Sequence, residues 1–354
     1  MRIAICTDAW HPQVNGVVRT LAATVDRLIA YGHEVELVTP SQFRTMPMPG
    51  YGEIRLAMLP RFGTRRTLSD FAPDVVHIAT EGPIGWSARS WCKANGVPFT
   101  SAFHTRFPEY AAVRTGLSVN RFWPVMRRFH GPSRAVLVST PSLADELAQQ
   151  GIKQTRLWTR GIDRDLFVPG REPLPELADL PRPIMLNVGR AAIEKNLVAF
   201  LEADVPGTKV VVGSGPDLMR LQARFPEAVF LGARHGEDLA RAYCSADVFV
   251  FPSRTDTFGL VMIEAMACGV PVAAFPVPGP LDVVGSQGRG PANDLPMQIG
   301  ALDEDLSLAI NKALRCDRLG AAVQGARYNW DRATEQFLAA VSQAIQPVRE
   351  MEPA

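Results

Sequence analysis

Short runs rich in valine and isoleucine alternate with longer helical patterns along the whole chain, and this alternation constrains the fold more than any other feature. The first half contains RIAICTD, EVELVTP, DVVHIAT, PFTSAFH and AVLVSTP, and the second half contains PIMLNVG, KVVVGSG, AVFLGA, DVFVFPS and PVAAFPV. Continuous apolar strands separated by helices are typical of parallel sheets covered on both faces. We therefore predict an α/β protein with two doubly wound domains of five strands each. Ligands of such folds bind beyond the carboxyl ends of the strands, so a cleft between the two domains is expected.

A segment rich in proline and charge, residues 167–183, separates the two series of strands. It is read as an interdomain linker, which gives domains at 1–166 and 184–327. Residues 328–346 show apolar spacing typical of an amphipathic helix that closes the chain. The segment 285–305 is rich in glycine and proline and is expected to be an irregular loop.

The composition fits a protein with a large apolar core in a reducing environment. Of the 354 residues 47% are apolar, and the five cysteines are scattered without a C-x-x-C pair. This pattern favours the cytoplasm over a disulfide framework or a zinc site, and no metal is expected. The first apolar run turns polar at Thr7-Asp8, too early for a secretion signal or a membrane span.

The charge is divided unevenly along the chain. Residues 1–170 carry 20 Lys and Arg against 13 Asp and Glu, a net charge of +7, and the remainder carries 17 against 23, a net charge of −6. A basic first half suggests an anionic partner such as a membrane surface. Nucleic acid is disfavoured because the whole chain is near neutral and shows no recognised nucleic-acid motif.

Basic and aromatic residues mix in the segment 117–136, which includes Arg121, Trp123, Arg127 and Arg128. At helical spacing they fit an interfacial helix on anionic lipid, and the protein is then expected on the inner face of the cell membrane. The alternative is a surface helix whose aromatic residues belong to the core. The segment PRFGTRR adds further arginines to the same half.

Glycines follow several of the predicted strands. Asn15-Gly16 stands between the first strand and a helix predicted at 17–31, where free amides and the positive helix end suit a phosphate. A tight turn without a ligand is the alternative, and the absence of G-x-G-x-x-G argues against a nicotinamide or flavin enzyme. In the second half Arg190 and Lys195 follow one strand and Gly213 and Gly215 the next. Two cations facing glycine amides suit a diphosphate leaving group, and solvated loop cations are the alternative.

Two acids and a histidine complete the candidate residues. In TDTFGLVMIEAMACGV, Gly259 indicates a loop that leads into a helix near Leu260, so Asp256 and Glu264 converge from a loop and a helical first turn. Glu264 could accept from ribose hydroxyls or, alternatively, pair with a cation or the helix end. Asp256 could hold sugar hydroxyls or cap a turn. His104, just past a strand, could bond a sugar or shuttle a proton, or could be a structural turn residue.

The motifs Asn15-Gly16-Val17, FHTRFPEY, GRAAIEKN, GSGP, SADVFVFPS, TDTFGLVMIEAMACGVPV and YNW occur in this order and cover nearly the whole chain. Together they resemble the retaining glycosyltransferases of family 4. That resemblance implies the GT-B fold of two facing Rossmann-like domains, and Asp256 and Glu264 occupy the family's E-x7-E positions. The first acid is aspartate rather than glutamate, and PGPLD replaces the common Gly-Gly-x-x-Glu turn.

The resemblance also implies roles for individual residues. Glu264 would bind the nucleotide ribose, and Arg190, Lys195 and the Gly16 amide would hold the diphosphate. The residues implied at the donor sugar and the reacting carbon are Asp256, Phe258, Gly259 and His104, and the chemistry needs no metal cofactor.

The resemblance is greatest to family members that glycosylate lipids. It implies a hexose donor such as GDP-mannose, a UDP-hexose or UDP-glucuronate, and a membrane lipid acceptor. The alternatives are a soluble or polysaccharide acceptor, or a non-catalytic protein that binds nucleotide sugars.

Overall fold

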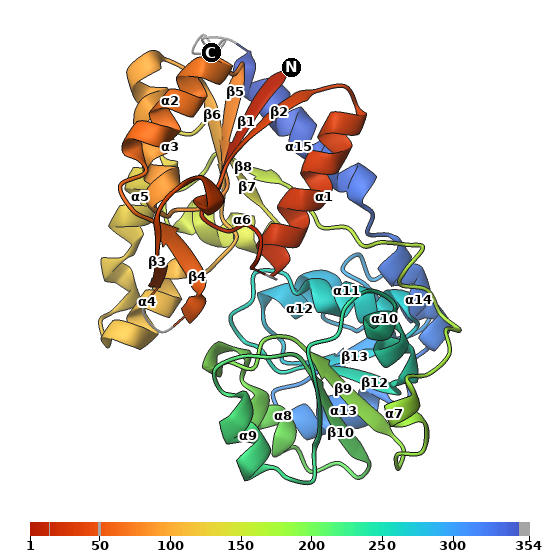
Figure 1. Cartoon of the computed structure of the whole chain (residues 1–354). Coiled ribbons are helices and arrows are strands. Elements are labelled where there is room, and N and C mark those ends of the chain that lie inside the picture. Colours follow the sequence, from red (N-terminus) through yellow and green to blue (C-terminus); the bar gives the residue numbers. More distant parts are fainter. Residues whose placement is uncertain (14, 49–50, 347–354) are drawn as a thin grey trace. The chain divides into compact units, whose positions relative to one another are not determined.

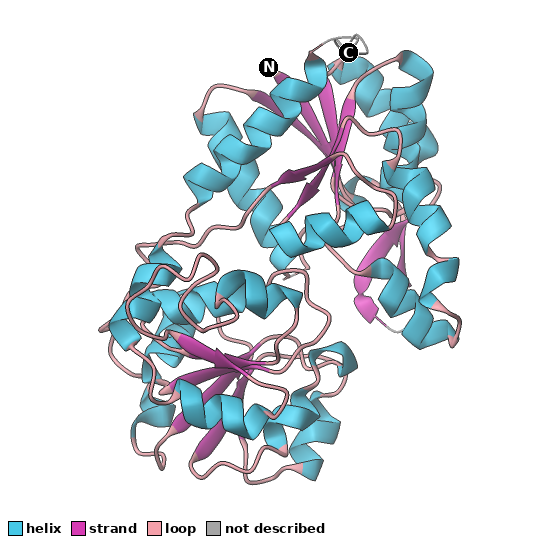
Figure 2. Cartoon of the chain, turned by 180° about the vertical axis from the view of Figure 1, so that it is seen from behind, coloured by secondary structure: helices cyan, strands magenta, loops and turns pink. Residues whose placement is uncertain are grey.

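The chain divides into two compact units, each built around a six-stranded parallel sheet. The computed structural model describes residues 1–13, 15–48 and 51–346. Unit 1 contains Met1–Thr159 and the segment from Trp330 onward, and unit 2 contains Arg160–Asn329. In both units the strands lie between layers of helices (Figure 1, Figure 2). The predicted α/β class with two parallel-sheet domains is confirmed.

The sheet of unit 1 has the strand order β2-β1-β5-β6-β7-β8, and its neighbouring strands are parallel. The strands are β1 (Arg2–Cys6), β2 (Glu34–Val38), β5 (Val75–Ile78), β6 (Phe99–Ala102), β7 (Ala135–Val138) and β8 (Thr155–Leu157). The helices are α1 (Gly16–Ala30), α2 (Arg61–Phe71), α3 (Pro83–Asn95), α4 (Phe107–Thr115), α5 (Trp123–His130), α6 (Pro141–Gln149) and α15 (Trp330–Ile345). An antiparallel hairpin, β3 (Thr45–Met48) and β4 (Tyr51–Ala57), is added before α2.

Strand β5 shows how both faces of this sheet become buried. Successive side chains of a strand point to opposite faces. Val76 and Ile78 lie in one apolar cluster with residues of α2 and α3, whereas His77 contacts Phe337 of α15. All four residues of β5 are buried. A strand covered on both faces is nearly apolar throughout, and the one polar residue of β5, His77, is hydrogen-bonded to Thr100 at 2.9 Å.

The sheet of unit 2 has the order β11-β10-β9-β12-β13-β14 and is also parallel. The strands are β9 (Ile184–Val188), β10 (Thr208–Val212), β11 (Val229–Gly232), β12 (Val248–Phe251), β13 (Val272–Ala274) and β14 (Gly300–Leu302). The helices are α7 (Pro175–Ala178), α8 (Leu197–Leu201), α9 (Leu218–Arg224), α10 (Gly236–Ser245), α11 (Leu260–Ala267), α12 (Pro278–Val283), α13 (Leu306–Ala313) and α14 (Arg318–Ala326).

Each sheet has one strand more than the five predicted. The additional strands, β8 and β14, have three residues each, TRL and GAL. Neither contains an apolar run, because TRL has two polar residues and GAL begins with glycine. β14 lies inside the segment 285–305, which was predicted to be an irregular loop throughout.

The predicted linker at 167–183 differs from the structure, because this segment belongs to unit 2. Phe167, Leu174 and Leu177 are 2%, 3% and 0% exposed and lie in the core of unit 2. The chain passes between units at Thr159 and Arg160 rather than at 166 and 167. The prolines and charges that suggested a linker alternate with apolar residues that are buried, so the segment packs as an arm of the second domain.

The C-terminal helix α15 returns to unit 1. Phe337 is fully buried, and its ring contacts His77 and Trp158. The predicted closing helix therefore completes the first domain. Among the described residues, no helix is both long and apolar enough to cross a bilayer.

His77 makes unit 1 sensitive to acid. The ring is fully buried with Nδ1 2.9 Å from Thr100 Oγ1, and burial lowers its pKa to about 3. The unfolded chain binds a proton near pH 6.5, whereas the folded chain keeps the ring neutral. Folding stability is therefore complete above pH 6.5 and falls as the pH drops toward 3.

We predict that His77→Phe flattens this acid dependence. Wild-type unit 1 should lose about 1.4 kcal/mol of unfolding free energy per pH unit below 6 through His77, and the variant should lack this contribution. All six tryptophans lie in unit 1, so urea unfolding followed by their fluorescence reports on that unit alone. His11→Phe, at an exposed position, is the control. Equal pH slopes for wild type and His77→Phe would contradict the assignment.

Candidate active site

The loops that follow three neighbouring strands of unit 2 meet at one edge of its sheet. β9 pairs with β10 on one side and with β12 on the other. Asn196 Nδ2 donates to Pro252 O at 3.1 Å, and Ser253 Oγ donates to Glu194 O at 3.4 Å. These bonds join the loop after β9 to the loop after β12. The carboxyl edge of a parallel sheet is the usual place for a ligand in this class of fold.

A lysine and an aspartate meet between these two loops. Lys195 Nζ lies 2.5 Å from Asp256 Oδ1, and the two side chains are 28% and 17% exposed. Lys195 ends a short 3₁₀ turn, Ile193–Lys195, and Arg190 is partly exposed in the same loop after β9. The structure thus brings together an acid and a cation that lie 61 residues apart in the sequence. A partly open Lys–Asp pair can contact both an anion and a hydroxyl group.

Gly213 and Gly215 allow the loops after β9 and β10 to approach closely. A Cβ atom on Gly213 would collide with the carbonyl oxygen of Gly189, and one on Gly215 with that of Ala191. The Gly213 N–H donates to Gly232 O at 2.8 Å. That amide is thus used within unit 2, and close backbone packing is the role that the structure supports for Gly213.

Helix α11 begins after a glycine with left-handed backbone. Gly259 has φ +89°, and a Cβ there would meet Met262 and Phe251. Phe258 is 5% exposed and packs edge-on against Tyr328 at 5.6 Å. The predicted loop and the helix start at Leu260 are confirmed, and only glycine fits this bend without strain.

Glu264 lies in the core of unit 2. It is the fifth residue of α11, beyond the first turn where it was expected. It is 0% exposed, and the hydroxyl group of Tyr243 in α10 donates to Oε2 at 2.9 Å. Burial of a carboxylate is costly without hydrogen bonds, which explains its pairing with a buried tyrosine. Tyr243 could not be selected from the sequence, because an aromatic residue in a helix usually packs in the apolar core.

Gly16 begins helix α1 in unit 1. The side chain of Asn15 accepts hydrogen bonds from the amides of Val17 and Val18, each at 3.0 Å. This N-cap explains why Asn15 precedes Gly16, and it uses two amides of the first turn. The Gly16 amide is not one of those two, so its predicted contact with a phosphate stays a prediction.

His104 follows β6 in unit 1 and is 8% exposed. Its ring lies 5.4 Å from that of Trp158, which follows β8. The structure therefore fixes the imidazole at the carboxyl edge of the sheet of unit 1. Its proposed role at a reacting carbon stays a prediction.

The basic and aromatic segment contains a 3₁₀ turn, Val119–Arg121, and helix α5, and one of its predicted membrane contacts is wrong. Trp123 is 3% exposed and stacks on Phe103 at 6.1 Å in the core of unit 1. Arg121, Arg127 and Arg128 are exposed. The aromatic spacing therefore reflects core packing, as in the alternative interpretation, and only the arginines are available to a partner.

Asp8 is a buried carboxylate that the sequence analysis did not single out. Its oxygens accept from the amide of Ile84, at 3.0 Å, and from Gly85 and the Thr80 hydroxyl group, so it holds the start of α3. Burial raises its pKa to about 6, and the hydrogen bonds only partly offset this effect. Asp8 therefore holds the loop after β5 in place, and its carboxylate is not open to a ligand.

Comparison with known families agrees with this geometry. The protein-family model described as "Glycosyltransferase Family 4" matches residues 14–166, and the family model described as "Glycosyl transferases group 1" matches residues 182–314.

Several curated proteins are similar over most of the chain. A GDP-mannose-dependent alpha-mannosyltransferase of Mycolicibacterium smegmatis is 34% identical over 80% of this chain and 82% of its own length. The protein of the same name in Mycobacterium tuberculosis is 32% identical over 80% and 81%. The alpha-monoglucosyldiacylglycerol synthase of Streptococcus pneumoniae is 26% identical over 77% and 71%.

Solved structures agree on the fold. Sucrose-phosphate synthase from Thermosynechococcus elongatus has a TM-score of 0.74 and 22% identity over 97% of this chain and 98% of its own. HepE from Anabaena, in complex with UDP and glucose, has a TM-score of 0.68 and 16% identity over 96% and 99%. The sequence relatives and family models together show that this chain belongs to the family 4 glycosyltransferases, has their GT-B fold, and is a glycosyltransferase.

Proposed function

We propose that the chain moves a hexose from a nucleotide-diphosphate sugar to a membrane lipid, with retention of the anomeric configuration. The observation that carries the donor part of this proposal is the Lys195–Asp256 pair beside the glycine-lined strand ends of unit 2. In a nucleotide sugar a phosphate and the sugar hydroxyl groups are a few bonds apart. A cation and an acid 2.5 Å apart match that arrangement.

Lys195 and Arg190 supply positive charge where the diphosphate leaves. Bond breaking between the sugar and the diphosphate places negative charge on the leaving oxygen, and fixed cations stabilise it. GDP-mannose is the first donor to test, since two relatives above 30% identity are named for it. The UDP-hexoses and UDP-glucuronate are the other donors to compare. This charge stabilisation requires no metal ion.

Asp256 accepts from hydroxyl groups of the donor sugar, together with the backbone around Phe258 and Gly259. The role that we propose for His104 is to act at the reacting carbon, and the acceptor attacks from the face that the diphosphate leaves. The departing diphosphate oxygen then helps to take the proton of the acceptor hydroxyl group, so that no other base is needed.

An exposed apolar surface of unit 1 supports a lipid acceptor at a membrane. Leu59 and Phe62 are 88% and 83% exposed, and Met58 is half exposed. We name these three residues the apolar tip. Leu59 also has a left-handed backbone, φ 48°, which costs free energy for a residue other than glycine. Exposed apolar side chains of this size mark interaction sites.

Arginines follow the apolar tip in the sequence. Arg61, Arg65 and Arg66 of α2 are exposed. Helix α2 packs on α3, and Arg89 of α3 donates to the backbone of α5 at Phe129, 3.0 Å. The exposed Arg127 and Arg128 of α5 therefore belong to the same layer of helices. Apolar side chains beside arginines suit an anionic bilayer, where the former insert and the latter meet phosphate groups. We propose that this peripheral contact is made on the inner face of the cell membrane, where anionic lipids attract arginines.

We predict that Lys195→Ala weakens binding of the nucleotide diphosphate about 10- to 100-fold, because a charge-assisted hydrogen bond is worth about 1.5–3 kcal/mol. Isothermal titration with GDP and UDP measures it. Lys312→Ala is the matched control, since Lys312 forms a 2.7 Å pair with Asp303 in the same unit. If Lys195→Ala bound the nucleotide diphosphate with wild-type affinity, the assignment of the diphosphate to this site would be wrong.

A second prediction separates ribose binding by Glu264 from a purely structural role. Glu264→Gln keeps the shape of the side chain but removes its charge, whereas Tyr243→Phe removes the hydroxyl group that donates to Oε2. We expect at least about a tenfold loss of nucleotide affinity in Glu264→Gln, since hydrogen bonds to a charged group are the stronger ones. Tyr243→Phe should bind nucleotide nearly as wild type and lose thermal stability. If both variants lost the same thermal stability and bound nucleotide with wild-type affinity, Glu264 would have only a structural role in the core.

The membrane proposal predicts that Leu59→Ser/Phe62→Ser reduces binding to vesicles containing phosphatidylglycerol by more than about tenfold, because each apolar side chain contributes about 1.5–3 kcal/mol on burial. Vesicle co-sedimentation measures this. The control, Met219→Ser/Leu319→Ser, changes two exposed apolar residues of unit 2. Arg127→Ala/Arg128→Ala should weaken binding more at low salt than at high salt. Wild-type binding by Leu59→Ser/Phe62→Ser would contradict the membrane contact and favour a soluble acceptor.

A further inference from the structure

An open pocket lies beside the glycine-rich loop that joins helix α12 to strand β14 in unit 2. Its volume is about 580 Å³. The loop forms one wall, and the residues between helices α13 and α14 form the other. Sites for small molecules commonly have volumes of this order. The sequence marked this segment as irregular, and the proposed transferase activity gives it no role.

The pocket lies at the edge of the sheet opposite to Lys195. Strand β14 is parallel to β13 and begins at Gly300, so the residues before it lie at the amino edge. Arg318, the first residue of α14, agrees with this position, because its guanidinium donates to the carbonyl oxygen of Ala246, just before β12, at 3.0 Å. The pocket is therefore separate from the candidate active site, whose residues follow the carboxyl ends of β9 and β12.

The loop wall has a shape that its own contacts fix. Gly288 has φ +69°, and a Cβ atom there would collide with the carbonyl oxygen of Gly300. The side-chain amide of Gln298 donates to Gln287 O at 3.1 Å, and Gln298 O accepts from the amide of Asp317 at 2.7 Å. The last bond joins the two walls. A ligand therefore meets a pocket that is already ordered, which lowers the entropic cost of binding.

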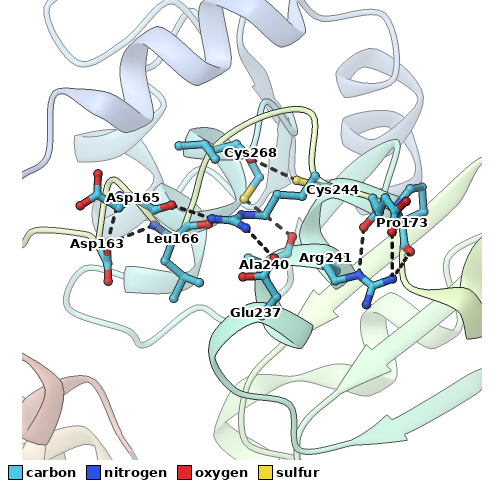
Figure 3. Close-up of polar contacts among 12 residues, drawn as sticks. Asp163, Asp165, Leu166, Pro173, Glu237, Ala240, Arg241, Cys244 and Cys268 are labelled. Atoms are coloured by element: carbon cyan, nitrogen blue, oxygen red, sulfur yellow. Dashed lines mark hydrogen bonds and ion pairs between the residues drawn. The ribbon is translucent and has the colours of Figure 1, made fainter.

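Two arginines line the pocket with N–H groups to spare. Arg289 donates through Nη2 to the carbonyl oxygen of Pro296, which holds its guanidinium in place. In the part of the chain that the structure describes, the side chain of Arg315 makes no hydrogen bond or ion pair. Arg241 of the same unit is different, since it donates to the carbonyl oxygen of Pro173 at 3.1 Å (Figure 3). Two guanidinium groups with free donors suit a phosphate group.

The other side chains of the pocket suit a sugar. Asp317 accepts from the amides of Leu319 and Gly320 at 3.2 and 2.8 Å, and these bonds offset part of its negative charge. Its carboxylate oxygens have further lone pairs that can accept from a hydroxyl group. Met297, which is 59% exposed, offers an apolar surface to carbon atoms.

We propose that this pocket binds a sugar phosphate. The phosphate group lies between Arg289 and Arg315, a hydroxyl group of the sugar donates to Asp317, and the carbon atoms of the sugar contact Met297. A bare phosphate ion would leave most of the pocket empty, so the ligand has an organic part. This inference concerns the pocket alone and does not depend on the donor assignment.

The test is isothermal titration of the full-length chain with mannose 6-phosphate at pH 7.5, where the phosphate is mostly a dianion. We expect a dissociation constant below about 1 mM. Arg289→Ala and Arg315→Ala should each weaken binding about tenfold or more, because each removes a charge-assisted hydrogen bond. Arg224→Ala is the control, since this exposed arginine of α9 pairs with Glu202. Inorganic phosphate should bind more weakly, and mannose should not bind.

A further variant separates the pocket from the candidate active site. Lys195→Ala should bind mannose 6-phosphate as wild type does. Arg289→Ala and Arg315→Ala should bind GDP or UDP as wild type does. If mannose 6-phosphate binding were lost in Lys195→Ala and kept in both arginine variants, the sugar phosphate would occupy the donor site and the proposal would be wrong.

Cys316 offers a measurement that needs no substitution. It lines the pocket and is partly exposed, as is Cys244 in α10. Saturating mannose 6-phosphate should slow alkylation of Cys316 by N-ethylmaleimide several-fold, measured by peptide mass spectrometry, and should leave the rate at Cys244 unchanged. No binding to the wild-type chain, equal affinity in the arginine variants, or an unprotected Cys316 would each overturn the proposal.

Discussion

The site of unit 2 depends on the parallel pairing of β9 with β10 on one side and β12 on the other. These strands are buried on both faces, since Ile184 and Leu186 of β9 belong to one apolar cluster and Met185 to the other. Removing such a strand from its neighbours would expose two apolar surfaces and a set of backbone hydrogen bonds. The chain must therefore leave each strand at the same edge of the sheet. Lys195 and Asp256 meet because of that geometry.

A second rule applies to the polar groups buried inside the two units: each one is either uncharged or hydrogen-bonded to a partner. His77 stays neutral between aromatic rings, and Glu264 is bonded to Tyr243. The interface of α10 and α11 carries one such pair, the Tyr243–Glu264 bond. Packing between these helices thus positions an acid of the family motif.

Much of the fold was predictable from the sequence, because apolar runs of four or five residues identify buried parallel strands. The ten predicted strands come from such runs. The helix after Gly259 and the family resemblance come from other short patterns of neighbouring residues. Strands β8 and β14 were missed because TRL and GAL contain no apolar run, whereas the equally short β13, VAA, lies in a longer one. The segment 167–183 was assigned to a linker because its prolines and charges obscure the buried Phe167, Leu174 and Leu177.

The candidate site was predictable only in part. Lys195 and Asp256 could be selected by residue type and position after a strand, but their contact depends on the order of strands in the sheet. The burial of Trp123 and the pairing of Tyr243 with Glu264 depend on which face of a helix meets the core. The exposure of Leu59 and Phe62 also depends on tertiary structure. No local sequence pattern contains that information.

The central claim is that unit 2 binds a nucleotide diphosphate sugar at Lys195 and Asp256. The most direct measurement is differential scanning calorimetry of the purified chain with GDP, UDP, ADP and NAD, each with wild type and with Lys195→Ala. Stabilisation by about 2.7 kcal/mol is expected at 100 times the dissociation constant of the bound nucleotide. We predict stabilisation by one uridine or guanosine diphosphate that is lost in Lys195→Ala. Stabilisation by NAD alone, or by none of the four, would contradict the claim.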